Sequence, residues 1–309
     1  MSHSSISTRI KGGWLLLRSI AVIASSITTI VSTMIPIYLY YSFPTNQLIL
    51  IFLLLIFAAF TIHGVLTHVW NDYIDNQSGT DLHSPGILSG GSRVIQTGLI
   101  STTALSTLGK WLSIILSMFV VGFALFGFYK LAILLAIGLW AAISYSLPPF
   151  RLSYRPFVGE WFSTFPSILA LGLAGAWLTL DTIPVWAWQN AIINGLFCIA
   201  WIMVHHIPDR NADQQATPVK QTSVVWAVNK FGVSFCRLPA IVYFLLTGIC
   251  AWWLGFERLW AMIGMLIMVI TAIFLVFKMD VNDAYQVSAY EKIILVLAMI
   301  NGVWLGIFI

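Results

Sequence analysis

Two short acidic motifs are the residues in this sequence whose types and spacing could do chemistry. The first contains Asp72 and Asp75, three positions apart, and the second contains Asp209 and Asp213, four positions apart. On a helix, either spacing places both carboxylates of a pair on one face. Two anions held together repel each other unless a cation lies between them, so each pair predicts a binding site for a hard divalent ion.

Magnesium is the ion that such pairs favour. It binds oxygen ligands, and in proteins it usually takes one or two carboxylates together with phosphate oxygens of a substrate. Two pairs that face each other would hold two or more magnesium ions, and a diphosphate is the natural ligand to complete their coordination shells. The alternative is that each pair is an ordinary solvated helix end. The occurrence of two pairs at matching positions argues against this alternative.

Basic residues supply the other half of a diphosphate site. The segment Gly90-Gly91-Ser92-Arg93 ends in a guanidinium whose planar fork suits phosphate oxygens. Tyr145 closes the fourth apolar stretch, and Arg151 follows it. Arg18 is a charge near the start of the first apolar stretch, where a lone charge is a functional candidate. The alternative for these basic residues, and for Lys220, is that they set the membrane topology and contact lipid headgroups.

Histidine and cysteine do not form a transition-metal motif. His205 and His206 are adjacent, and adjacent residues on a helix point in different directions, which argues against a shared metal. A hydrogen bond from one of them to an acceptor molecule or to an aspartate is left open. Cys198, Cys236 and Cys250 show neither metal spacing nor a disulfide framework and are interpreted as small apolar residues.

The elements that must position these residues are transmembrane helices. The chain has 309 residues, of which 59% are hydrophobic and 8% charged, against about 25% charged in a soluble domain. A bilayer-spanning helix needs about 20 apolar residues, and nine stretches qualify. The sequence therefore predicts an all-α, multi-pass integral membrane protein in a single domain, residues 1–309. The nine predicted spans are 17–42, 46–70, 104–128, 130–147, 160–180, 183–204, 237–255, 258–277 and 290–309.

The distribution of lysine and arginine predicts how these helices are oriented. With the N-terminus inside, all 15 of these residues except Lys130 and Arg258 fall on inner segments. This bias follows the positive-inside rule and predicts a cytoplasmic N-terminal segment, residues 1–13. Both acidic motifs then lie where the long inner connections begin, about 71–103 and 205–236, so the chemistry is expected at the cytoplasmic face. Because the basic residues are dispersed, they do not indicate nucleic-acid binding.

The two motifs also carry a family resemblance. Nine helices with Asn71-Asp72-Tyr73-Ile74-Asp75 after the second and the Asp209/Asp213 pair after the sixth resemble the UbiA superfamily of intramembrane prenyltransferases, over nearly the whole chain. The stretches NDYIDNQSGTD and GGSRVIQTGLIS look most like the branch that prenylates 1,4-dihydroxy-2-naphthoate in menaquinone synthesis, and residues 154–160 resemble that branch's YRGLGE. The resemblance implies helices around a central cavity and a bacterial or archaeal-type inner membrane.

Residue roles follow from the resemblance position by position. It implies two magnesium sites in which the four aspartates are the catalytic residues: Asn71, Asp72 and Asp75 in the first, Asp209 and Asp213 in the second. It implies diphosphate contacts from these residues: Arg18, Asn71, Arg93, Tyr145, Arg151 and Lys220. Arg151 stands where many relatives have lysine, and Arg18 fits a basic position on the first helix less closely.

Two positions depart from the pattern of the superfamily. Gly79 stands where a third acidic residue is often found, and Asp81 follows two positions later, as in the naphthoate branch. Lys220 lies in Pro218-Val219-Lys220-Gln221-Thr222, where that branch usually reads GKRT. The departures near Lys220 lie toward the expected acceptor end, so the donor chemistry is better supported than the identity of the acceptor.

The expected reaction is magnesium-dependent transfer of a prenyl group from a prenyl diphosphate to an aromatic or other lipophilic acceptor. The expected partners are that donor, that acceptor and the lipid bilayer, with no obligate protein partner. A terpene cyclase of the same superfamily, which needs no external acceptor, is the alternative enzyme. A cation-coupled transporter is a third possibility, although transporters usually place their carboxylates near the bilayer midplane.

Overall fold

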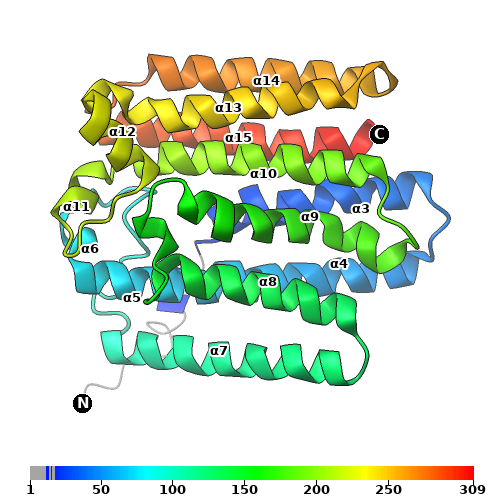
Figure 1. Cartoon of the computed structure of the whole chain (residues 1–309), viewed down its shortest axis with the longest axis horizontal. Helices are drawn as coiled ribbons and strands as arrows, with labels where there is room; N and C mark the ends of the chain where they lie inside the picture. The colour runs from blue at the N-terminus through cyan, green and yellow to red at the C-terminus, as the bar shows by residue number, and fades with distance from the viewer. Residues whose placement is uncertain (1–11, 14, 16–17) are drawn as a thin grey trace.

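The computed structural model describes residues 12, 13, 15 and 18–309. Throughout this part of the chain the regular structure is helical, without strands, and the long helices run side by side (Figure 1). The fold class predicted from the sequence is therefore confirmed. The predicted cytoplasmic segment 1–13 lies outside the described residues apart from positions 12 and 13.

Nine helices in the described part are long and apolar enough to cross a membrane, as predicted. They are Ile20–Tyr40, Thr45–Ser78, Thr102–Leu125, Tyr129–Ser146, Glu160–Thr179, Val185–His206, Val233–Leu254, Phe256–Lys278 and Ala284–Ile307. The largest differences from the predicted limits are at the end of the second span and the start of the ninth. An apolar-run criterion stops at the first polar residues, whereas backbone hydrogen bonding continues the helix through them.

The first two spans each contain a π-helical segment. The first comprises α2 (Ser19–Val22), η1 (Ile23–Ile27) and α3 (Thr28–Tyr40), and the second α4 (Thr45–Ala59), η2 (Phe60–Thr67) and α5 (His68–Ser78). Nδ1 of His63 on η2 lies 2.8 Å from Oγ of Ser26 on η1, so the two widened segments meet. Segments of this kind are frequent at functional sites, and both of these residues line the main cavity.

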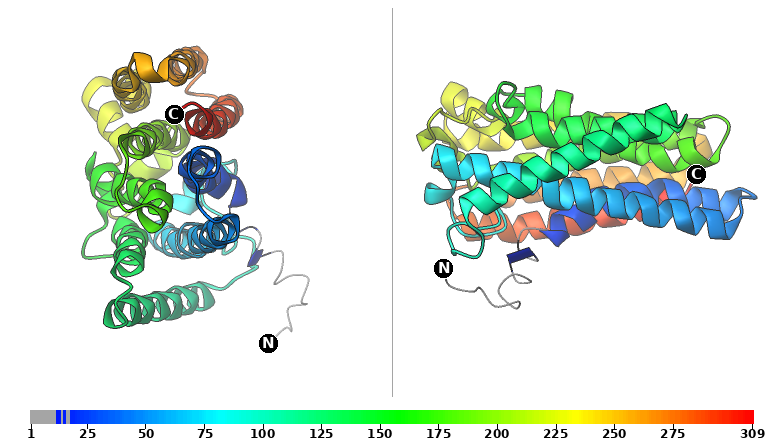
Figure 2. Two further views of the ribbon diagram at one scale, coloured as in Figure 1. Left: turned by 90° about the vertical axis from the view of Figure 1, so that its right-hand side faces the viewer. Right: turned by 90° about the horizontal axis from the view of Figure 1, so that it is seen from below.

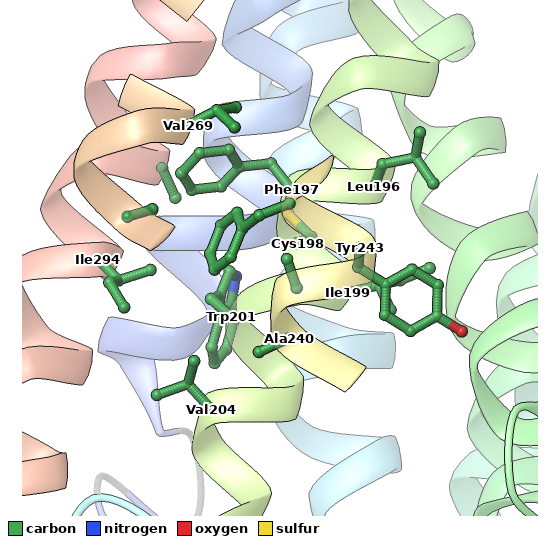
Figure 3. Close-up of a cluster of buried hydrophobic side chains, with 14 of the residues drawn as sticks. Leu196, Phe197, Cys198, Ile199, Trp201, Val204, Ala240, Tyr243, Val269 and Ile294 are labelled. Atoms are coloured by element: carbon green, nitrogen blue, oxygen red, sulfur yellow. The ribbon is translucent and has the colours of Figure 1, made fainter. Parts of the chain in front are cut away.

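Helix α10 (Val185–His206) lies at the centre of the bundle, and Figure 2 shows other helices around it. Its side chains are buried along most of its length, and it packs against α9 (Phe165–Thr179), α13 (Leu238–Ala251) and α15 (Ala284–Ile307). Figure 3 shows Phe197 and Trp201 of α10 in an apolar cluster that includes Ile294 of α15. Because α10 is held on several sides, the acidic motif that follows it starts from a fixed place.

The polar connections gather at one end of the bundle. Figure 1 shows the short helices α6 (Thr80–His83), α11 (Arg210–Gln215) and α12 (Ser223–Phe231) together at the end opposite the C-terminus. The remaining long helices are α7 (Thr102–Leu125), α8 (Tyr129–Ser146) and α14 (Leu259–Lys278). The two long connections thus lie on the same side, as the sequence predicts; which side of a membrane this is stays a prediction.

At the opposite end of the bundle, the buried side chain of Arg258 holds three helices together. Nη1 of Arg258 donates to Oε1 of Gln189 at 2.8 Å, and Nη2 donates to Oδ1 of Asn190 at 2.9 Å. The same guanidinium donates to the carbonyl oxygens of Leu305 and Phe308, each at 3.0 Å. These bonds join the start of α14 to α10 and to the end of α15, so Arg258, which the sequence places on the outer side, has a structural task.

Replacing Arg258 with methionine should destabilise the protein, because the amide oxygens of α10 would be left buried without donors. We expect a loss of about 3 kcal/mol, seen as a Tm lower by about 5 °C or more in thermal unfolding of the detergent-solubilised protein. Glu257→Gln changes the exposed neighbouring residue and is the matched control. Equal Tm values for the two variants would contradict this role for Arg258.

Candidate active site

The two acidic motifs lie at the same end of the bundle and meet at one cavity. Asp75 on α5 lines this cavity together with Asp209, the N-cap residue of α11, and Asp213 within α11. All three side chains are buried. The structure thus brings together residues more than 130 positions apart in the sequence, as the paired motifs predict. Asp81 lines the same cavity, whereas Asp72, which is equally buried, lies just behind its surface.

Two glycines bring the carboxylates together. Gly90 and Gly91 have φ angles of 80° and 76°, which L side chains rarely adopt. A Cβ atom on Gly91 would lie 3.0 Å from both carboxylate oxygens of Asp81 and 3.1 Å from Oδ1 of Asp72. A Cβ atom on Gly90 would lie 2.7 Å from the carbonyl oxygen of Pro85. The backbone therefore passes directly against the acidic groups, which is possible only without side chains at these two positions.

The same loop donates hydrogen bonds to one aspartate of each motif. The amide and the hydroxyl of Ser92 donate to Asp72, with the amide nitrogen 3.2 Å from Oδ1. The hydroxyl of Ser89 donates to Oδ1 of Asp209 at 3.1 Å, and the amide of Gly90 donates to Oδ2 at 3.0 Å. These bonds fix the orientation of both carboxylates and join the end of α5 to the start of α11.

Lys220 reaches the first motif, although its segment departs from the family pattern. Its Nζ atom lies 2.9 Å from Oδ1 and 2.8 Å from Oδ2 of Asp75, and the pair is buried. The chain returns Lys220 to this place because its amide donates to the carbonyl oxygen of Asp213 and that of Thr217 donates to the carbonyl oxygen of Ser78. The loop after α11 therefore closes over the end of α5.

Two further carboxylates have side-chain oxygens without a hydrogen-bond donor within the described part of the chain, although Oδ2 of Asp81 accepts from Nε2 of Gln96 at 3.3 Å. Neither side-chain oxygen of Asp213 accepts a hydrogen bond, and Oδ1 of Asp81 accepts none. Buried oxygens without donors are costly, and a hard cation satisfies them. Among residues 12, 13, 15 and 18–309, no three His, Cys, Asp or Glu side chains form a complete metal-binding group. Magnesium does not need one, because water and substrate phosphate complete its shell; the residues present fit that ion.

Electrostatics at this end also favour a bound cation. Burial raises the pKa of Asp213 well above its usual range, although the charge of Lys220 opposes the shift. Burial and the charges of Asp75 and Asp72 together raise the pKa of Asp81 to about 8. Burial alone would lower the pKa of Lys220, but the carboxylates of Asp75 and Asp213 raise it well above its usual range. One ammonium group thus faces several carboxylates, and the imbalance favours added positive charge.

The cavity extends from the acidic end into the apolar interior. Its volume is about 450 Å³. Beyond the polar end its wall is mainly apolar, with side chains from several spans, including Leu55, Leu116, Phe119, Phe123, Leu134 and Ile168. A concave apolar space with polar groups at one end suits an amphiphile with an anionic head and a hydrocarbon tail.

Four of the six sequence-predicted diphosphate residues line this cavity beside the aspartates: Lys220, described above, and Arg18, Tyr145 and Asn71. Arg18 donates from Nη2 to the carbonyl oxygen of Leu88 at 2.8 Å, and the same atom lies 3.1 Å from Nε2 of His205. The hydroxyl of Tyr145 lies 3.5 Å from Nε2 of His206. Asn71 lines the cavity as well and donates from its side chain to Oδ2 of Asp75 at 3.0 Å.

The other two predicted residues lie off the cavity wall. Arg93 donates to the carbonyl oxygens of Asp81 and Ser84, so its fork holds the loop that carries the glycines. Arg151 has its guanidinium carbon 5.6 Å from the ring centre of Tyr154. Contact of either arginine with a diphosphate stays a prediction.

Several residues in this site were not assigned a role from the sequence. Asp81 was noted only as a departure from the family pattern, and the glycine pair only as the lead-in to Arg93. Tyr154 was missed: Nζ of Lys220 lies 5.9 Å from its ring centre, and burial raises the pKa of its hydroxyl. The acidic residue two positions after Gly79 and the adjacent glycines were the available signals.

The comparisons with known proteins agree with this fold. The UbiA prenyltransferase family model matches residues 22–299. A UbiA homolog from Archaeoglobus fulgidus bound to GPP and Mg2+ superimposes with a TM-score of 0.65 at 15% identity, covering 96% of this chain and 99% of that one. A second structure of a UbiA homolog from Archaeoglobus fulgidus gives 0.61 at 14% identity, with 95% and 99% covered. No curated protein matches the chain. At these identities the structural likeness establishes the fold.

Gly91→Ala should weaken magnesium binding, because the added methyl group would push against Asp72 and Asp81. Gly98→Ala is the matched control: Gly98 also has a positive φ, 69°, but a Cβ atom there meets nothing within 4 Å. We expect the magnesium dissociation constant, measured by calorimetry, to rise about tenfold or more for Gly91→Ala alone, as for other residues that orient metal ligands. An equal change in both variants would mean that backbone strain alone is responsible.

Magnesium binding should strengthen as the pH rises. Below about pH 8 Asp81 holds a proton in the metal-free protein, and the ion must displace it. We therefore expect affinity to increase, and proton release to fall, between about pH 6.5 and pH 8.5. Calorimetry in buffers of different ionisation enthalpy measures both, and Asp81→Asn should reduce the proton release, while Asp213, whose pKa is also raised, supplies the rest. An affinity that does not change with pH would contradict the prediction.

Proposed function

This chain belongs to the UbiA prenyltransferase family, and from that premise we propose that it transfers a prenyl group from a prenyl diphosphate to a lipophilic aromatic acceptor such as 1,4-dihydroxy-2-naphthoate. The transfer is magnesium-dependent. The observation that carries the proposal is the cavity, which has carboxylates and Lys220 at one end and apolar walls along the rest. This matches the two halves of a prenyl diphosphate.

The carboxylate end is where the diphosphate head belongs. Asp75, Asp209 and Asp213 face the cavity there, and Asp72 and Asp81 converge on the Gly91 backbone beside it. Magnesium bound among these groups would neutralise the charge that develops on the departing diphosphate, a large term in such reactions. The structure of the Archaeoglobus fulgidus homolog bound to GPP and Mg2+ supports the choice of a prenyl diphosphate and magnesium as ligands.

The chain's own residues prepare the site for that step. Lys220 brings a buried positive charge to the head end, where its Nζ atom lies 2.8 Å from Oδ2 of Asp75. Aromatic side chains such as Phe119 and Phe123 line the tail region and steady an allylic cation through their ring faces. The apolar walls also exclude the water that would otherwise capture such a cation.

The head end is proposed to face the cytoplasm. All but two of the lysines and arginines, Lys130 and Arg258, lie on the side predicted to be inner, and the positive-inside rule then orients the bundle. The membrane is proposed to be a bacterial or archaeal-type inner membrane. The acceptor 1,4-dihydroxy-2-naphthoate rests on the sequence stretches at 71–81, 90–101 and 154–160, which resemble the menaquinone branch.

Diphosphate release should require both magnesium and an acceptor. We expect purified protein in detergent to release diphosphate from geranylgeranyl diphosphate only when magnesium and 1,4-dihydroxy-2-naphthoate are both present, with a prenylated product. Asp209→Asn and Asp213→Asn should lower kcat about 100-fold or more, because each removes charge from the head end. Asp181→Asn, an exposed residue between the fifth and sixth spans, is the control.

Other outcomes separate the alternatives. Release with magnesium alone, together with a cyclic hydrocarbon product, would identify a terpene cyclase. Wild-type turnover in Asp72→Ala and Asp209→Ala would contradict the site assignment. No release from any prenyl diphosphate would contradict the enzymatic proposal itself.

A further inference from the structure

A buried carboxylate lies outside the two acidic motifs, on α15. The side chain of Glu291 has no exposed surface, and its Oε2 atom has no hydrogen-bond partner among the described residues. Its Oε1 atom lies 2.6 Å from Nδ1 of His205, at the end of α10. An ionisable side chain within a membrane-crossing helix is costly and marks a functional candidate.

Arg18 determines which nitrogen of His205 carries the proton. Nη2 of Arg18 lies 3.1 Å from Nε2 of His205. A guanidinium only donates hydrogen bonds, so Nε2 accepts with its lone pair. Nδ1 then carries the ring proton and donates it to Glu291. The arrangement therefore holds a neutral imidazole in one tautomer, with its basic nitrogen turned away from the carboxylate.

That basic nitrogen lies where two cavities adjoin. His205, Arg18 and Trp201 line both the main cavity and a second one of about 370 Å³. The second cavity is walled largely by apolar side chains, among them Ile20 and Leu295. Figure 3 shows Trp201 on α10 beside α15, one turn from the position of His205. A lipophilic molecule at this junction meets Nε2 once it replaces a single hydrogen bond from Arg18.

Arg18 is placed so that it can give up that bond. The same Nη2 group also donates to the carbonyl oxygen of Leu88 at 2.8 Å, which anchors the guanidinium when His205 is engaged elsewhere. The φ angle of Arg18 is 43°, in the left-handed region that non-glycine residues rarely occupy. Such strain persists only where the surroundings impose it and is concentrated at functional sites.

The other titratable groups around His205 do not take over this role. Nδ1 of His68 on α5 donates to the carbonyl oxygen of Gly64, 3.1 Å away. His206 points to Tyr145. Asp209 is held by the Ser89–Gly90 loop. Within the part of the chain that the structure describes, the His205–Glu291 pair is the arrangement in which a carboxylate backs an imidazole.

We propose that His205 accepts, at Nε2, the hydroxyl proton of the prenyl acceptor, and that Glu291 is the positioning residue that holds the ring and stabilises the resulting imidazolium. The inference rests on the proposed function, which it deepens by assigning the proton step and the acceptor class: a lipophilic molecule with an aromatic hydroxyl group. A carboxylate behind an imidazole is a recurring arrangement for proton abstraction.

The step balances in atoms and charge. The C1–O bond of the prenyl diphosphate breaks, and its electron pair leaves with the diphosphate. The acceptor hydroxyl gives its proton to Nε2, and the electron-rich ring carbon forms the new bond to C1. The hydrogen on that carbon then moves to the oxygen and restores the aromatic ring. The proton on His205 finally passes to water or to the released diphosphate.

The test uses His205→Gln and Glu291→Gln in the full-length protein, with His83→Gln and Glu257→Gln, both exposed, as matched controls. The acceptors are 1-naphthols whose hydroxyl groups differ in acidity, and the donor is geranyl diphosphate. We expect His205→Gln to lower kcat about 100-fold or more at neutral pH, with the donor KM and magnesium-dependent donor binding within about twofold. The loss should shrink at higher pH and with more acidic naphthols, because those hydroxyls ionise without a base.

The remaining outcomes overturn the inference. A wild-type kcat in His205→Gln would exclude His205 as the base that accepts the acceptor's proton. A loss of the same size at every pH and with every naphthol, accompanied by a lower Tm, would show that the pair only fastens α15 to α10. If the wild-type protein binds geranyl diphosphate and magnesium but prenylates no hydroxyl-bearing acceptor, the proposed function fails, and the inference fails with it. This failure is seen in the wild-type protein itself, whereas a failure of the inference alone is seen only in the variants.

Discussion

Carboxylates crowded at the end of an apolar bundle repel one another, and the rest of this structure depends on how that repulsion is held in check. Asp72, Asp75, Asp81, Asp209 and Asp213 are all buried, so water screens them poorly. Lys220 offsets one of them, and amides and hydroxyls of the 89–92 loop offset two more. The remainder is an excess of buried negative charge, which is the basis for the proposed binding of a divalent cation and, through it, of a diphosphate.

Helix α10 connects that charged end to the interior. Its burial among α9, α13 and α15 fixes where it ends, and that end sets the start of the second motif at Asp209. The last turn also carries His205 to Glu291 on α15 and to Arg18, which directly precedes α2. One well-packed helix therefore positions both the aspartates proposed to hold the donor's diphosphate and the pair proposed to take the acceptor's proton.

One cavity connects the acidic end with the apolar interior. The cavity is polar at one end and apolar along the rest because the second span is divided in the same way: α4 and η2 are apolar, and α5 carries the acidic motif. The π-helical segments η1 and η2 contact each other in the cavity wall through Ser26 and His63. This division suits the proposed substrate, whose hydrocarbon chain would lie against the apolar walls and whose charged head would lie at the acidic end.

The sequence by itself determined the nine spans and the pairing of the two motifs, because bilayer length and helical spacing leave few alternatives for such apolar runs and aspartate pairs. It also indicated Lys220 through the family resemblance. The tertiary structure decided which side chains meet. Arg93, predicted for a diphosphate, is turned toward backbone carbonyls, whereas Glu291, which no local pattern distinguished, lies against His205, 86 positions away in the chain. The spacing of residues in the sequence predicts only which side chains share a face of one helix. Contacts between helices depend on how each helix is rotated and packed, which cannot be inferred from a local stretch of sequence.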